Sequence, residues 1–126
     1  MDPDDPDAAD EIDLSEKELT AIPMLVFELD LENITTLCFE GNSIESIPEQ
    51  IGNMSYVEEL YLRRNAIKAL PSRIGEMEAL DSLYLEDNEL TAEGIPATIG
   101  ELSNLKGLCL HRNKLTVSRL DQSRSA

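Results

Sequence analysis

The chain has 126 residues, 41% of them hydrophobic, which is enough apolar material for the core of one domain. Its 26 acidic and 10 basic residues give a net charge of −16, so binding to nucleic acid or to an anionic membrane surface is not expected. No apolar run approaches the roughly 20 residues that a membrane-spanning helix needs. The start of the chain also lacks the pattern of a secretory signal peptide.

After Met1, the first ten residues contain only Asp, Pro and Ala. This composition predicts that residues 1–10 form an acidic disordered tail. A calcium-binding loop is a weak alternative, because Pro3 and Pro6 interrupt the spacing of ligands that such a loop requires.

From residue 11 onward, one pattern of aliphatic and polar residues recurs along the chain. It reads Leu-x-x-Leu-x-Leu-x-x-Asn-x-Leu, with Ile, Val or Phe in place of some leucines. Its asparagines, separated by 23, 23 and 25 positions, are Asn42, Asn65, Asn88 and Asn113. The pattern predicts a repeat domain over residues 11–116 and a polar C-terminal tail over 117–126. The domain divides into a degenerate first unit (11–33), three repeats (34–56, 57–79 and 80–104) and a partial last repeat (105–116).

The spacing within each unit predicts a short strand followed by a longer return segment. In Leu-x-Leu, both leucines lie on one side of a strand, because side chains alternate between its two faces. A return of roughly a dozen residues brings the chain back beside its start, as parallel pairing requires. One unit cannot bury its apolar side alone, so stacked units are expected to form a curved coil with a parallel sheet on its inner side.

This pattern closely resembles the leucine-rich repeat family. The 23-residue units, with Leu70-Pro71 and Ile74-Gly75, are similar to the intracellular repeats of Ras-associated scaffold proteins. The third repeat, with Gly94-Ile95-Pro96, is similar to plant-type repeats. The resemblance implies an α/β repeat fold, a right-handed leucine-rich repeat solenoid. In such a solenoid a short-stranded parallel sheet forms the concave face, and irregular or short helical segments form the convex face.

Asparagine, proline and glycine are expected to shape each coil. The asparagines are expected to form a structural ladder, in which their amides satisfy backbone groups at the corner after each strand. The prolines fix φ on the outer return. The recurring glycines, Gly52, Gly75 and Gly100, are expected to adopt a left-handed turn before the next unit.

The sequence has few of the residues that catalysis needs. It contains one histidine, His111, and neither a Gly-rich phosphate loop nor paired histidines at metal-binding spacing. The adjacent carboxylates of Glu86 and Asp87 would point to opposite faces of a strand, so they make a poor catalytic pair. We therefore expect no enzyme activity, no cofactor and no metal site.

The two cysteines are expected to remain reduced. Cys38 and Cys109 occupy the same place in repeats three rungs apart, which puts them about 14 Å from each other, whereas a disulfide needs Cα atoms within about 7 Å. Reduced thiols favour the cytosol. The triplets beginning at Asn33 and Asn53 match the N-glycosylation pattern, which matters only in a secreted chain.

Strand positions that point away from the core should form columns across the inner face, and one column places Tyr61 beside Tyr84. The residues expected to contact a partner are Tyr61, Tyr84, Arg63, Arg64, Glu59, Glu86, Asp87, His111 and Arg112. The tyrosines would be apolar anchors, the arginines would bind acidic side chains and the carboxylates basic ones. The alternative is that the tyrosine pair only stabilises the sheet by cross-strand packing, while the arginines bridge to Glu86, Asp87 or Glu59.

These features predict a non-enzymatic protein–protein interaction module that binds another protein through its concave face. The family resemblance implies a cytoplasmic scaffold or regulatory protein, which we expect to be monomeric. Two alternatives remain open. The chain could be a structural element that assembles through its uncapped C-terminal strand edge, or a fragment of a larger receptor-like or signalling protein.

Overall fold

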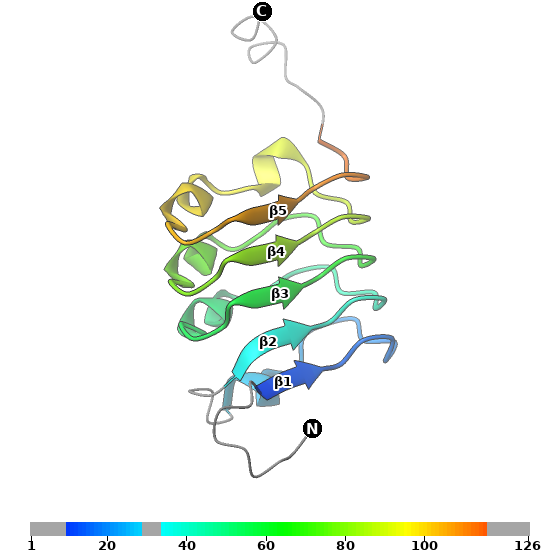
Figure 1. Ribbon diagram of the computed structural model, residues 1–126. Coiled ribbons are helices and arrows are strands. Elements are labelled where there is room, and N and C mark those ends of the chain that lie inside the picture. Colours follow the sequence, from blue (N-terminus) through cyan, green and yellow to red (C-terminus); the bar gives the residue numbers. More distant parts are fainter. Residues whose placement is uncertain (1–9, 29–33, 116–126) are drawn as a thin grey trace, which may run out of the picture.

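The structure, a computed structural model, describes residues 10–28 and 34–115. Apart from Asp10, the tails predicted at 1–10 and 117–126 lie outside the described residues. Five strands pair in parallel in the order of the sequence, so each strand lies between its neighbours in the chain. They are β1 (Asp10–Asp13), β2 (Ile34–Cys38), β3 (Glu59–Tyr61), β4 (Ser82–Tyr84) and β5 (Gly107–Cys109). Figure 1 shows them stacked as the rungs of a ladder, with the return segments on the other side.

Short 3-10 helices form the return segments. They are η1 (Met24–Glu28), η2 (Glu49–Asn53), η3 (Ser72–Glu76), η4 (Ala92–Gly94) and η5 (Ala97–Glu101). Pro48, Pro71 and Pro96 directly precede η2, η3 and η5, with φ between −72° and −71°, because the proline ring holds the backbone near this angle. In the described part of the chain, every helix is too short to cross a bilayer. The predicted solenoid, with its parallel sheet and short helical returns, is confirmed.

The pairing of β1 with β2 shifts by one residue between Asp10 and Glu11, and from Glu11 onward the register between coils is constant, so equivalent residues of successive repeats lie side by side. Leu37 pairs with Leu60, which pairs with Leu83, and the next residue in each strand is aligned in the same way. Beyond the strands the ladder continues: the Arg64 N–H donates to the Glu86 carbonyl at 3.0 Å. This register places residues of the same repeat position in columns that run across the inner face.

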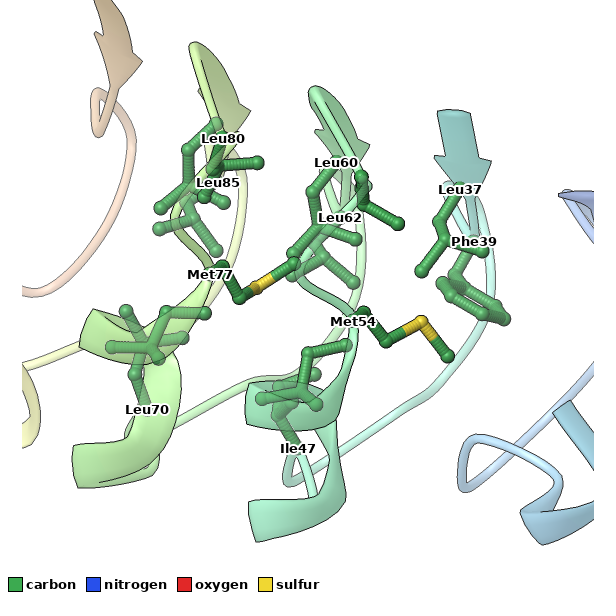
Figure 2. Close-up of a cluster of buried hydrophobic side chains, with 14 of the residues drawn as sticks. Leu37, Phe39, Ile47, Met54, Leu60, Leu62, Leu70, Met77, Leu80 and Leu85 are labelled. Atoms are coloured by element: carbon green, nitrogen blue, oxygen red, sulfur yellow. The ribbon is translucent and has the colours of Figure 1, made fainter. Parts of the chain in front are cut away.

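The core lies between the sheet and the return segments. The inward leucines of the three central strands are fully buried, as are Phe39 and its equivalents in the next two coils. Figure 2 shows Met54 and Met77 pointing into the space between the strands and the 3-10 helices, and both are at most 1% exposed. Each fully buried aliphatic side chain contributes about 1.5–3 kcal/mol, so the stacked interior is the main source of stability.

The prediction that the recurring glycines make left-handed turns is wrong. Gly52, Gly75 and Gly100 lie in 3-10 helices, and among the described glycines a positive φ (74°) occurs at Gly41 alone. At Gly52 and Gly75 the reason for glycine is close packing, because a Cβ would lie 2.8 Å and 2.5 Å from a carbonyl oxygen of the next return. At Gly100 a Cβ would meet no described atom within 4 Å.

Candidate functional site

The centre of the inner face carries a stacked pair of tyrosines. Parallel pairing aligns Tyr61 of β3 with Tyr84 of β4, and the ring centroids are 4.7 Å apart with an angle of 6° between the planes. This spacing matches the separation of neighbouring strands. Both side chains are half-buried, so the pair forms a flat aromatic shelf on the sheet.

A hydrogen bond fixes one ring of this shelf. The Tyr61 hydroxyl donates to Glu59 Oε1 at 2.5 Å, and both residues come from β3, two positions apart on the same face. This bond to a carboxylate, together with partial burial and the negative charge of Glu59, raises the pKa of Tyr61 well above its ordinary value. The hydroxyl therefore keeps its proton, and Glu59 is held beside the shelf.

Arg63 lies over the tyrosine shelf, between two carboxylates. Its guanidinium carbon is 5.8 Å and 5.5 Å from the centroids of Tyr61 and Tyr84, within the range of cation–π attraction. Its Nε is 2.8 Å from Glu40 Oε2, although the angles are not those of a linear hydrogen bond, and its Nη1 is 4.0 Å from Glu86 Oε2. Arg63 therefore crosses three adjacent coils.

The other two arginines are also engaged by carboxylates of this chain. Arg64 is 3.6 Å from Glu16 and 3.9 Å from Glu40. Arg112 makes a two-point contact with Asp87, in which Nε and Nη2 donate to the two carboxylate oxygens at 2.5 Å and 2.9 Å. These bonds hold the pKa of the Asp87 carboxyl below its ordinary value.

The structure therefore brings together most of the residues expected to contact a partner, but many of them contact each other. Tyr61, Tyr84, Arg63 and Glu86 form one cluster with Glu40, and Asp87 pairs with Arg112 at the β5 end. Glu59 pairs with a tyrosine and not with an arginine. His111 is exposed, in the coil next to Glu86, and its backbone carbonyl accepts a hydrogen bond from the Asp87 N–H.

An open hollow of about 440 Å³ lies on the same face, towards β1. Four of the nine residues that line it are acidic, and they are Glu11, Asp13, Glu40 and Glu59. The sequence pattern predicts that inner-face residues form columns, but it does not reveal that the columns of the first three coils surround a hollow. The signal was the run of acidic residues at inner positions of the first two coils.

Asp13 and Cys38 both line this hollow. Asp13 accepts hydrogen bonds from the Ser15 hydroxyl at 2.6 Å and the Ser15 N–H at 3.0 Å, which lower the pKa of its carboxyl. Cys38 is buried, and this burial raises the pKa of its thiol. Both Cys38 and Cys109 are free thiols. In the described ranges, no group of three or more His, Cys, Asp or Glu side chains is arranged to hold a metal ion.

The four asparagines lie behind the face and hold each coil to the one before it. Each side-chain amide donates to a carbonyl three residues earlier and to a carbonyl of the preceding coil, while its oxygen accepts from a backbone N–H of that coil. For Asn88 these partners are Leu85 O at 3.0 Å, Leu62 O at 2.9 Å and Ile67 N at 3.0 Å. The equivalent bonds are made by Asn42, Asn65 and Asn113.

Several solved structures are similar to this chain. A leucine-rich repeat protein of Leptospira interrogans is 30% identical with a TM-score of 0.70, over 85% of this chain and 32% of the other. An internalin (inlF) of Listeria monocytogenes is 30% identical with a TM-score of 0.61, over 71% of this chain and 26% of the other. A chain in the BIR3–SERK2 complex of Arabidopsis thaliana is 28% identical with a TM-score of 0.68, over 83% of this chain and 56% of the other.

No family model matches the sequence, and no curated protein matches it significantly. This chain spans between about a quarter and a little over half of the length of the three similar chains. They come from two bacteria and a plant, so they do not single out either the Ras-group or the plant-type subfamily. The constant register of the coils, the recurring asparagine bonds and the three similar structures agree, and the chain belongs to the leucine-rich repeat family.

Proposed function

We propose that this chain is a non-enzymatic protein-binding module that uses the inner face of its sheet. The observation that carries the proposal is the stacked pair of Tyr61 and Tyr84 on a sheet face that no other described segment covers. Tyrosine is frequent at binding hot spots. Because the rings stack and Tyr61 is tied to Glu59, binding would cost little side-chain entropy.

Two further observations support this function. One of the similar structures is a complex of two proteins, BIR3 and SERK2. The adjacent carboxylates of Glu86 and Asp87 are committed to different neighbours, one beside Arg63 and the other bonded to Arg112, which does not suit paired acid–base chemistry. Because both cysteines are free thiols, we also propose an intracellular setting, as a scaffold or regulatory protein.

The test is affinity capture from the native cell, comparing the wild type with the double variant Tyr61→Ala/Tyr84→Ala. We expect the double variant to lose the captured partner while keeping the circular dichroism spectrum of the folded chain. Tyr56→Ala is the matched control, since Tyr56 is a 52% exposed tyrosine outside the strands. If the double variant captures the same proteins as the wild type, the inner face is not the binding surface.

A second candidate function is assembly through the β5 edge. Leu108 and Leu115 are 40% and 37% exposed, whereas their equivalents one coil earlier, Leu83 and Leu90, are fully buried. An exposed strand edge with apolar residues can pair with another chain. Light scattering across a range of concentrations separates the two functions, because edge assembly requires the mass to rise with concentration and to fall back in Leu108→Glu.

A further inference from the structure

The inner face holds more negative charge than its own cations neutralise. Arg112 pairs with Asp87 at the β5 end, and Arg63 and Arg64 both lie near Glu40 in the middle. Within residues 10–28 and 34–115, neither Glu11 nor Glu59 forms an ion pair, and both line the hollow. The arginines of the inner face are therefore paired with carboxylates of the same chain, and the unpaired charge of this face is negative.

A buried carboxylate in the coil that follows the hollow shows the same shortage of donors. Glu86 is 7% exposed, and its Oε1 accepts no hydrogen bond in the described part of the chain. The nearest ion-pairing group is Arg63, whose Nη1 is 4.0 Å from the other oxygen of Glu86 and whose Nε is 2.8 Å from Glu40. A buried carboxylate oxygen without a donor is unfavourable, and a network completed by one more donor is stabilised.

One added cation would complete this network. Glu40 lines the hollow and shares Arg63 with Glu86. If an ammonium or guanidinium group entered the hollow and paired with Glu40, Arg63 would be free to move towards Glu86. Both carboxylates would then have a close cation, and the Tyr61–Tyr84 shelf would remain available to the apolar part of the ligand.

We propose that the ligand of the inner face is an extended segment of a protein partner that places a lysine or arginine side chain in the hollow between β1 and β3. This inference rests on the proposed function and names the chemistry of the partner. Charge complementarity carries it: four carboxylates and one already paired guanidinium surround the hollow. The residues that flank this lysine or arginine in the partner segment then pack against the Tyr61–Tyr84 shelf.

The probe is a short fluorescent peptide in which lysine alternates with threonine, and its counterpart has glutamate in place of lysine. Binding is followed by fluorescence anisotropy at low and at physiological ionic strength. We expect the lysine peptide to bind, more weakly as salt rises, and the glutamate peptide not to bind. In Glu11→Gln/Glu59→Gln the affinity for the lysine peptide should fall by roughly five- to twentyfold, since two charges are lost from the hollow.

The control variant is Glu45→Gln/Glu93→Gln, which makes the same change in net charge on exposed return segments. We expect it to change the affinity by less than about twofold. Equal weakening in the two double variants would mean attraction to the overall charge and would overturn the inference. Failure of the lysine peptide to bind the wild type would also overturn it. Loss of the native partner in Tyr61→Ala/Tyr84→Ala would in that case still support the proposed function.

Discussion

Replacing a buried asparagine in the middle of the asparagine ladder should destabilise the fold far more than replacing the partly buried asparagine at its C-terminal end. Asn88 is 7% exposed, and its side chain bonds the Ile67 N–H and the Leu62 and Leu85 carbonyls. In Asn88→Ala these three backbone groups lose their partners at a place that water does not reach. The perturbation changes no apolar contact between the leucines of the core.

The expected magnitude follows from the number of groups left unsatisfied. A buried polar group without a partner costs about 1–3 kcal/mol, and partial relaxation lowers the sum over three groups, so the free energy of unfolding should fall by about 3–5 kcal/mol. Asn113 makes equivalent bonds, to Leu90 N and to the Leu85 and Leu110 carbonyls, but is only partly buried. Because water can replace its bonds, Asn113→Ala should cost only about 1 kcal/mol.

The assay is urea unfolding followed by far-ultraviolet circular dichroism, with the wild type and both variants measured under identical conditions. Asn88→Asp is the control for cavity formation, because it keeps the size of the side chain and the acceptor for Ile67 N–H but loses the amide donors. We expect it to retain more than half of the loss seen in Asn88→Ala. Equal losses in Asn88→Ala and Asn113→Ala, or a loss below about 1 kcal/mol in Asn88→Ala, would refute the reasoning.

Two further perturbations test other contacts. In Gly75→Ala the new Cβ would lie 2.5 Å from the Thr98 carbonyl oxygen, so the free energy of unfolding should fall by about 1–3 kcal/mol. Gly100→Ala is the control and should be within about 0.5 kcal/mol of the wild type. Equal thermal unfolding midpoints in the two variants would contradict this prediction. The pKa of Asp87 is lowered in the folded chain, so its pairing with Arg112 stabilises the fold above the unfolded-state pKa and is lost as the pH falls through the folded-state pKa. Asp87→Asn should therefore be less stable than the wild type at neutral pH in urea titrations, and the difference should disappear as the pH falls below the folded-state pKa. A difference that persists at low pH would show that the pairing is not its cause.

The positions of residues on the inner face could be predicted from the sequence because the fold repeats. A constant register turns the spacing of the asparagines into a spatial order, and so Tyr61 and Tyr84 could be placed side by side. The partners of the arginines could be predicted only in part: Glu86 and Asp87 are among the carboxylates expected to pair with them, but Glu40 is not. A long guanidinium side chain reaches several carboxylates, and the choice of Glu40 for Arg63 depends on side-chain conformations that a repeat pattern does not encode.

The role of the recurring glycines shows a second limit. A left-handed backbone and a close approach of two segments both select glycine, and the sequence alone does not distinguish them. At Gly75 the carbonyl of Thr98 in the next return occupies the space of a Cβ, which only the packing of successive coils reveals. The left-handed positions at the corners lie elsewhere, three residues after the end of each strand, and four of these five residues are not glycine.

These corner positions have a consequence for redesigning the inner rim. Arg64, Asp87 and Arg112 hold φ between 57° and 61°, a conformation that disfavours side chains by about 1–2 kcal/mol per residue. Glycine would remove the backbone strain at each of these positions, as it does at Gly41. The residue type found there therefore depends on the contacts of the side chain and not on the preference of the backbone. A library of variants that differ only at positions 64, 87 and 112 would therefore change the charge of the rim one coil at a time, without altering the leucines of the core.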